Sequence, residues 1–314
     1  MIPSECVIEV EAENMNNKES ISEKGLNGLT FAIDGKLQRW FPDVLSVYLD
    51  IHGAKLKQSV TKQCNYLVST NPSSETVKAK RARELQIPVL AEDEFYFLIR
   101  KLYHDGETVL VPSWVKCIPQ GAFSLCKTMK TVILPENLLE IGSAFIDCTN
   151  LVNITIPAGV HLIDAAAFQG CSSLKTIVLP LIKSIRFNTF RDCKSLSSVT
   201  IPDCVTFIDN SAFQGCASLE TIRLPEKLEF LGKEAFRDCS ELKTISIPNG
   251  VHVIRHHTFL GCNKLQHVYL SPELHTIEYK AFQGCKKLTI HAPANSYAEQ
   301  FAKKNGIPVS LVSE

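Results

Sequence analysis

A phenylalanine recurs through the C-terminal two-thirds of this 314-residue chain at steps of 22 or 23 residues. A cysteine stands three residues after each phenylalanine, and three residues further on stands a leucine or, in the first copy, Met129. In most copies a β-rich stretch that ends in proline follows, such as IRLP at 222–225. A fixed period of this length is typical of a solenoid, in which each repeat stacks on its neighbours. The eight phenylalanines are Phe123, Phe145, Phe168, Phe190, Phe213, Phe236, Phe259 and Phe282.

The spacing within one repeat predicts two segments that each have an inward face. Phe, Cys and Leu at offsets of 0, 3 and 6 lie on one side of a short helical or 3₁₀ stretch, whereas the residues of 221–224 alternate as in a strand. One repeat cannot bury these faces alone. Stacked at about 4.8 Å per coil, the strands form a parallel sheet and the other side chains form ladders. We therefore expect Phe168, Phe190 and Phe213 on neighbouring coils.

Eight of the 12 cysteines belong to this repeat. Cysteine is small and among the most buried residue types, so it can fill a confined position in each coil. Neighbouring Cβ atoms would lie about 4.8 Å apart, whereas a disulfide needs about 3.8 Å, and a zinc site needs four ligands that converge on one point. We predict a ladder of buried free thiols at Cys126, Cys148, Cys171, Cys193, Cys216, Cys239, Cys262 and Cys285.

Two stretches, VTFIDNSAFQGCASLETIRLP at 205–225 and VHVIRHHTFLGCNKLQHVYL at 251–270, resemble the BspA-like leucine-rich repeat family. Its unit runs approximately I-x-x-x-A-F-x-x-C-x-x-L-x-x-I-x-I-P. The resemblance covers residues 109 to about 291 and implies a solenoid of about eight repeats within 107–314. The tail, about 288–314, resembles the terminal cap of that family, with a strand, a helix from about Ser296 to Asn305 and a final strand.

Residues 22–102 lack the repeat and alternate strand-like with helix-like stretches, which predicts a small α/β domain with a parallel sheet. The segments LNGLTFAIDG, HGAKLKQSVTKQCNYLVS and SSETVKAKRARELQIPVL resemble a BRCT domain, closest in style to single bacterial BRCT domains such as the one that ends the NAD-dependent DNA ligases. Gly53 and Ala54 match the small-residue pair of that family. The usual tryptophan of its last helix is absent, and Phe95 or Phe97 is expected in its place.

The remaining parts of the chain complete the predicted domain organisation. Residues 1–21 form an acidic segment, for which disorder is one interpretation, and 103–106 form a linker. The segment has acidic residues where a signal peptide is basic, and no apolar run of membrane-spanning length occurs in the chain. The expectation is a bacterial, cytoplasmic protein, which disfavours the adhesin role of many secreted BspA-like proteins and keeps the thiols reduced.

The BRCT resemblance suggests two kinds of contact. Phosphopeptide-binding members carry Ser or Thr before the glycine after the first strand, but here Asp34 precedes Gly35, and a carboxylate repels phosphate. The lysine that they use falls near Ala82. Four cations on the second helix, Lys78, Lys80, Arg81 and Arg83, have two interpretations: a solvated face beside Glu75 and Glu84, or a contact for DNA phosphates or an acidic partner.

The outward positions of the repeat strands form a polar, nearly uncharged face. Thr and Val suit an exposed strand, so this face has a purely structural interpretation. The alternative is an extended surface for a protein or glycan partner, which is a common use of solenoid sheets. The candidate partner-binding residues are Thr176, Thr200, Thr221, Arg223, Thr244 and Tyr269.

No catalytic or metal-binding motif stands out. His252 and His275 should stack on adjacent coils with their imidazoles outward, where two nitrogens alone make a poor metal site. Walker A, G-x-G-x-x-G, G-x-S-x-G and H-E-x-x-H patterns are absent, so we predict no enzyme activity, no cofactor and no small-molecule substrate.

Two functions fit these features. The leading one is a non-catalytic protein–protein interaction or scaffold protein that uses the solenoid face and the BRCT domain as binding surfaces. The alternative is a DNA-associated accessory factor whose BRCT domain contacts DNA ends or a repair or replication protein. The net charge is zero, so any attraction to DNA would be local, and no membrane contact is expected.

Overall fold

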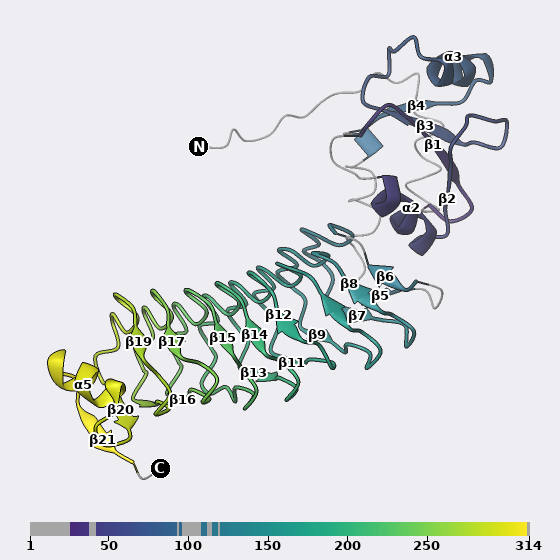
Figure 1. Ribbon diagram of the computed structural model, residues 1–314. Coiled ribbons are helices and arrows are strands. Elements are labelled where there is room, and N and C mark those ends of the chain that lie inside the picture. The colour runs from purple at the N-terminus through teal and green to yellow at the C-terminus, as the bar shows by residue number, and fades with distance from the viewer. Residues whose placement is uncertain are drawn as a thin grey trace. The chain divides into compact units, whose positions relative to one another are not determined.

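The computed structural model (Figure 1) describes residues 26–37, 42–92, 94–95, 108–111, 115–118 and 120–312. The chain divides into two compact units, Met1–Tyr103 and His104–Glu314. The predicted acidic segment 1–21 and linker 103–106 lie outside the described residues.

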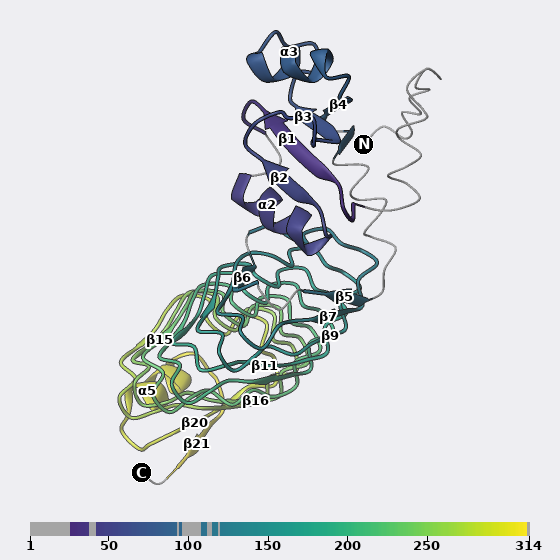
Figure 2. The same ribbon diagram turned by 90° about the vertical axis from the view of Figure 1, so that its right-hand side faces the viewer.

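The N-terminal unit is built on a parallel sheet with the strand order β2-β1-β3-β4. Phe31 of β1 pairs with Leu56 on one side and with Tyr66 on the other. Helices α2 and α3 lie on opposite sides of the sheet (Figures 1 and 2), as the alternating pattern predicts. The elements are β1 Thr30–Asp34, α2 Pro42–Ile51, β2 Lys55–Lys57, β3 Tyr66–Ser69, α3 Val77–Glu84 and β4 Val89–Ala91.

Each face of this sheet has its own core because successive residues of a strand point to opposite sides. Phe31 packs with Leu45 of α2 on one face, whereas Ala32 packs with Ala82 of α3 on the other. Phe95 is fully buried, and its ring centroid lies 5.1 Å from that of Phe31. Phe95 therefore fills a core position, as expected for the residue that replaces the missing tryptophan, while Phe97 lies outside the described residues.

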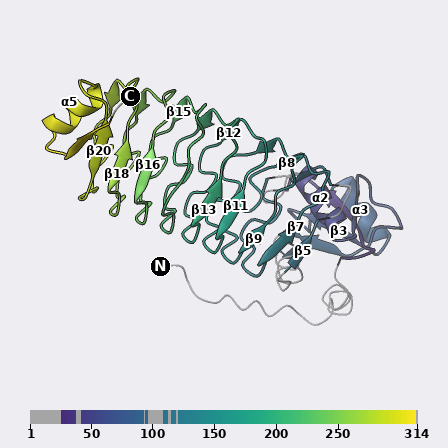
Figure 3. The ribbon, with the colours of Figure 1, turned by 90° about the horizontal axis from the view of Figure 1, so that it is seen from below.

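The C-terminal unit is a solenoid whose coils overlie one another when seen along its axis (Figure 2). One strand column, at the lower side of the solenoid in Figure 3, carries the predicted repeat strands, all in parallel pairs. Its strands are β5 Thr108–Leu110, β7 Thr131–Ile133, β9 Asn153–Ile154, β11 Thr176–Val178, β13 Ser198–Thr200, β16 Thr244–Ser246, β18 His267–Tyr269, β20 Thr289–Ala292 and β21 Val309–Leu311.

One predicted strand is wrong in this column. In the described stretch 120–312, the coil at 221–224 forms only a single bridge, from Thr221 to Thr244, and the sheet is interrupted there. Ile222 still points inward and is 8% exposed, so the alternation survives although the hydrogen-bond ladder does not. The predicted inward and outward positions of this coil therefore hold.

A second strand column runs along the solenoid and was not predicted. Its strands have two residues each, and Ile141, Ile163 and Ile185 are among their buried inward residues. The inward residues pack into the same core as the phenylalanine ladder. The strands are β6 Cys117–Ile118, β8 Glu140–Ile141, β10 Leu162–Ile163, β12 Ser184–Ile185, β14 Phe207–Ile208, β15 Phe230–Leu231, β17 Val253–Ile254 and β19 Thr276–Ile277.

The eight phenylalanines form the predicted ladder. Consecutive rings stack with centroids 5.3 to 5.8 Å apart and planes within 12° of parallel. Phe145 through Phe259 are fully buried at each ladder position. The expectation that Phe168, Phe190 and Phe213 lie on neighbouring coils is confirmed.

The eight cysteines form a second ladder of free thiols, all buried except Cys285, which is partly exposed. From the second coil on, each thiol donates a hydrogen bond to the backbone carbonyl of the phenylalanine one coil earlier, with sulfur–oxygen distances of 3.0 to 3.3 Å. Cysteine thus supplies a donor that alanine or valine would lack. The bonds join Cys148 to Phe123, Cys171 to Phe145, Cys193 to Phe168, Cys216 to Phe190, Cys239 to Phe213, Cys262 to Phe236 and Cys285 to Phe259.

The residue before each of these cysteines adopts a positive φ. Glycine or aspartate fills the position in every coil but the first, where Leu125 has a φ of 64°. An aspartate in one coil lies against the glycine of the next, so that a Cβ on Gly215 would be 2.5 Å from Oδ1 of Asp192. This packing accounts for the alternation of DC and GC along much of the repeat. The residues are Leu125, Asp147, Gly170, Asp192, Gly215, Asp238, Gly261 and Gly284.

We predict that Gly215→Ala lowers the free energy of unfolding of the solenoid by about 2 kcal/mol. About half comes from placing a Cβ at positive φ, and the rest from displacing Asp192. Urea denaturation measures the loss. Gly121→Ala is the matched control, because Gly121 has a φ of 78° and its Cβ would meet no atom within 4 Å. If both variants lose the same amount, the contact with Asp192 is not the cause.

The terminal cap has the predicted order of strand, helix and strand. Helix α5, Tyr297–Lys304, lies between β20 and β21, and the hydroxyl of Ser296 accepts a hydrogen bond from the Glu299 N–H at its start. Basic residues Lys303 and Lys304 occupy its last turn, where they oppose the negative end of the helix dipole. The cap covers the last coil of the core.

Candidate interaction surfaces

The outward side chains of the first strand column form a surface that we call the threonine face. In β11 the outer residues Thr176 and Val178 are exposed, and Ile177 between them is buried. Large apolar side chains also reach solvent here: Val178 is 65% exposed, Ile133 49% and Tyr269 41%. Of the predicted partner-binding residues, Thr176, Thr200, Thr221, Arg223 and Tyr269 are exposed, and Thr244 is half-buried. Their role in binding stays a prediction.

Charge on this face is sparse. Arg223 lies 3.4 Å from Asp203, and both side chains are exposed, so the pair stabilises the fold little. Lys243 and Glu220 pair across neighbouring coils, and the hydrogen bond from Lys243 lowers the pKa of the Glu220 carboxyl. The cations and anions therefore offset one another, and the face has no dominant charge.

Three ring side chains gather at the C-terminal end of the threonine face. Nδ1 of His267 lies 3.0 Å from Nε2 of His291, and the ring of Tyr269 stacks on His291 at 4.3 Å. Partial burial, together with His267, lowers the pKa of His291. His291 belongs to the cap, and the repeat pattern gave no signal for it.

The predicted histidine pair is confirmed in position. His252 and His275 stack on adjacent coils at 5.7 Å, and both are exposed. Across the described residues, no group of three or more histidines, cysteines, aspartates or glutamates is arranged to hold a metal ion. Within the same residues, no helix is long and apolar enough to cross a membrane.

The second strand column carries an aromatic pair, exposed Phe207 and half-buried Phe230, that the sequence interpretation missed. The rings of Phe207 and Phe230 stack at 4.2 Å, and the guanidinium of Arg255 lies 4.5 Å from the Phe230 centroid. The two phenylalanines stand six residues before Phe213 and Phe236, at the 23-residue step of the repeat. This shared position in the repeat is the feature of the sequence from which the pair could have been predicted.

The basic helix α3 is less free to bind phosphate than its sequence suggests. Lys80 and Arg83 both pair with Glu75, at 3.5 and 3.0 Å. Arg81 pairs with Glu84 at 2.8 Å, and Nζ of Lys78 donates to the Ile33 carbonyl at 2.8 Å. These contacts favour the solvated-face interpretation, although exposed ion pairs contribute at most about 1 kcal/mol each and can exchange.

Asp34 ends β1 in a buried hydrogen-bonded position. Its carboxylate accepts from the hydroxyls of Ser74 and Thr76, at 2.8 and 2.7 Å, and Thr76 also caps α3. The hydroxyl of Ser69 lies 3.4 Å from the same oxygen. A buried anion that already uses these donors would repel a phosphate, in line with the expectation from the sequence.

These geometries define a two-domain repeat protein: a compact parallel α/β domain and a solenoid with stacked phenylalanine and cysteine ladders. A family model for the BspA type leucine rich repeat region matches residues 104–185 and 183–301. A model for the BRCA1 C Terminus (BRCT) domain matches residues 22–99. The chain belongs to the BspA-type leucine-rich repeat family and carries a BRCT domain before the repeats.

The BRCT part is similar to DNA ligases. It is 41% identical over 81 residues to the DNA ligase of Lachnoclostridium phytofermentans, covering 26% of this chain and 12% of the ligase. It is 38% identical over 77 residues to the DNA ligase of Thermotoga maritima, covering 24% of this chain and 11% of that ligase. The similarity thus spans about an eighth of the length of these relatives.

A solved structure is similar to the solenoid part. The T. pallidum leucine-rich repeat protein TpLRR is 25% identical, with a TM-score of 0.47, and the match covers 67% of this chain and 88% of that chain.

Proposed function

We propose that this chain is a non-catalytic scaffold, in which the threonine face binds a protein partner and the BRCT domain supplies a second contact. The observation that carries this proposal is the exposure of large apolar side chains, such as Val178 and Tyr269, on a face without dominant charge. Apolar and aromatic groups at the centre of an interface supply most of its binding energy.

The chemistry of the cysteines supports a non-catalytic role for the solenoid. Burial raises the pKa of Cys193 and of Cys216 far above the ordinary value, which disfavours the thiolate that acts as a nucleophile. Their S–H groups are used in hydrogen bonds to the preceding coil. We also propose a cytoplasmic location, supported by the many free thiols of the described residues, which suit a reducing compartment.

A pull-down from a bacterial extract, with nuclease added, tests the threonine face. We expect the variant Thr176→Glu/Thr221→Glu/Arg223→Glu to lose its main recovered partner while its thermal midpoint stays within a few degrees, because these side chains point outward. The control Leu181→Glu/Lys227→Glu/Asn249→Glu makes the same change in net charge at other exposed positions. If every recovered partner stays bound to the first variant, the threonine face is not the partner-binding surface.

A second candidate function is a DNA-associated accessory factor. The identity of 41% to the BRCT part of a DNA ligase favours it. Binding of a nicked duplex, measured at low salt and then at rising salt, tests this role. We expect Lys80→Glu/Arg81→Glu/Arg83→Glu to abolish the binding, and the wild-type affinity to fall steeply with salt. Lys78 is left in place because its bond to Ile33 supports the fold. No binding at low salt would remove this candidate.

A further inference from the structure

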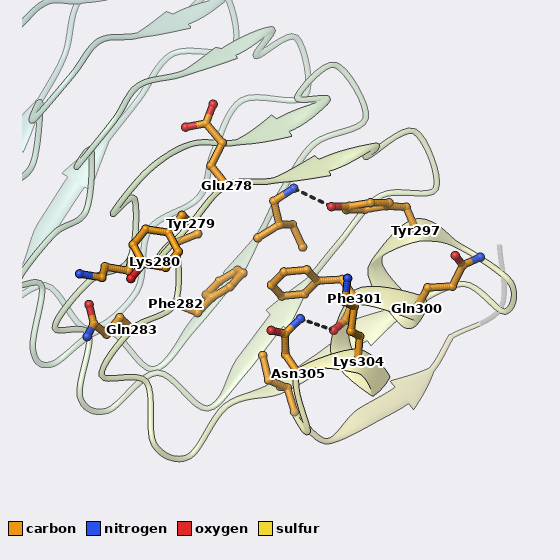
Figure 4. A pocket seen from close by; sticks show the side chains of 13 residues that line it. Glu278, Tyr279, Lys280, Phe282, Gln283, Tyr297, Gln300, Phe301, Lys304 and Asn305 are labelled. Carbon is orange, nitrogen blue, oxygen red and sulfur yellow. Dashed lines mark hydrogen bonds between the residues drawn. The ribbon is translucent and has the colours of Figure 1, made fainter.

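A cavity of about 610 Å³ lies at the capped end of the solenoid, between the last phenylalanine coil and helix α5 (Figure 4). Its volume falls within the range of about 300–1,000 Å³ typical of ligand pockets. Phe282 and Tyr279 of the last coil line it, together with Tyr297 and Phe301 of the helix. It therefore joins aromatic walls from two elements of one compact unit.

The phenylalanine ladder ends at this cavity. One face of Phe282 stacks on Phe259 at 5.3 Å, and Phe301 projects toward Phe282 from α5 (Figure 4). Phe282 as a whole is 9% exposed, and among the described residues Phe259 is the one ring that stacks on it. The walls are held in place: the Ile277 N–H donates to the Tyr297 hydroxyl at 3.3 Å. The cavity thus presents aromatic walls against which a further ring can pack.

The surroundings of the cavity are positively charged. Residues 278–314 contain five lysines and three glutamates, in a chain whose net charge is zero. Of these glutamates, Glu299 pairs with Lys303 at 2.6 Å. Lys280 and Lys304 line the cavity, and among the described residues neither has an ion-pair partner. Nζ of Lys280 lies 4.9 Å from the centroid of the Tyr279 ring. The cavity therefore combines aromatic walls with two lysines that have no carboxylate partner among the described residues.

Among the described residues, Glu278 is the one carboxylate that lines the cavity, and it is already engaged. Glu278 accepts a hydrogen bond from the His256 N–H at 2.8 Å and lies 4.0 Å from Nη1 of Arg255. Its negative charge therefore compensates the charge of Arg255 more than the charges of Lys280 and Lys304. The available charge at the mouth of the cavity is positive.

We propose that this cavity binds an aromatic side chain carried by an acidic peptide segment of a protein partner. The ring enters beside Phe282 and Phe301, and flanking carboxylates pair with Lys280 and Lys304. Offset aromatic pairs contribute binding energy beyond the burial of their area, and the lysines select for acidic neighbours. The site is distinct from the threonine face and does not depend on it.

Fluorescence anisotropy with the full chain and labelled synthetic nonapeptides tests this site. The probe has a central phenylalanine flanked by aspartates and glutamates, and two matched peptides replace the phenylalanine by alanine or the acidic residues by lysine. We expect the alanine peptide to bind at least tenfold more weakly and the lysine peptide to show no binding. Equal binding of the phenylalanine and alanine peptides, or no binding of the probe at millimolar protein, would overturn the proposal.

Protein variants separate this pocket from diffuse charge attraction. Lys280→Glu/Lys304→Glu should weaken binding of the probe at least tenfold. Lys286→Glu/Lys287→Glu makes the same change in charge at the same end of the solenoid, on residues that do not line the cavity, and should weaken it less than threefold. Phe301→Ala should also lose the preference for phenylalanine, with its thermal midpoint measured alongside. Equal losses in the two lysine variants would mean that the cavity is not the site.

Discussion

Phe213→Ala should lower the free energy of unfolding of the solenoid by about 3–5 kcal/mol, the range for removing a fully buried phenylalanine. The ring of Phe213 is 0% exposed and stacks on Phe190 and Phe236, in each case at 5.4 Å. In a repeat protein each coil is stabilised mainly by its two neighbours, so the cavity left by this ring weakens two interfaces at once. Urea denaturation, followed by circular dichroism, measures the loss.

Phe207→Ala is the matched control for this prediction. Its ring also stacks on a neighbouring phenylalanine, Phe230, at 4.2 Å, but it lies on the outer surface and is 36% exposed. Removing it opens no internal cavity, so we expect a loss of at most about 1 kcal/mol. Comparable losses in the two variants would show that the ladder is not the main source of stability in the core.

The repeat pattern predicted the ladders because their cause is local and repeated. Phe, Cys and Leu at fixed offsets require the same inward positions in every coil, and the alternation in 221–224 placed Thr221 outside and Ile222 inside even though no regular strand forms there. The second strand column escaped prediction because its strands have two residues, such as Ser184–Ile185, which is too short for an alternation to be visible.

The chemical reason for the cysteines was only partly visible in the sequence. Their size and burial followed from the spacing, but the bond from the Cys216 thiol to the Phe190 carbonyl depends on how one coil sits on the previous one. The need for glycine or aspartate before the cysteine likewise comes from a positive φ, as at Asp192, that no periodicity reveals.

Some of the candidate surfaces could likewise be predicted from the sequence, and one could not. The threonine face could be predicted from strand alternation, and the ion pairs of Glu75 were foreshadowed by its position beside the basic helix. The aromatic cavity could not be predicted from the sequence, because Phe282 belongs to the repeat and Phe301 to the cap helix. Only the folding of the cap onto the last coil brings the two rings together.

The cysteine ladder should make the solenoid unfold cooperatively in alkali. Burial raises the pKa of seven ladder thiols. The pKa of Cys285 rises to about 12, and the pKa values of the other six are also raised by a large amount. In the unfolded chain the same thiols ionise near pH ~8.5. Above that pH the unfolded state binds fewer protons than the native state, so the stability that these thiols contribute is intact below pH ~8.5 and is lost as the pH rises.

The expected size of this effect is large because the thiols act together. Each loses about 1.4 kcal/mol of stability per pH unit above its unfolded pKa, so seven lose on the order of 10 kcal/mol per unit. A domain with a typical stability of about 5–15 kcal/mol should therefore unfold within roughly two pH units above 8.5. Circular dichroism in a reducing buffer, read as a function of pH, locates the midpoint.

The number of protons released on unfolding distinguishes this mechanism from a general alkaline loss of stability. Urea titrations between pH 9 and 10 give that number as the slope of the unfolding free energy against pH. The variant Cys193→Ala/Cys216→Ala/Cys239→Ala should release about three fewer protons than the wild-type chain, whatever its starting stability, because ionisation of tyrosines and lysines is common to both. An unchanged slope would show that the ladder thiols are accessible in the native state, and the buried hydrogen-bonded ladder would then have to be abandoned.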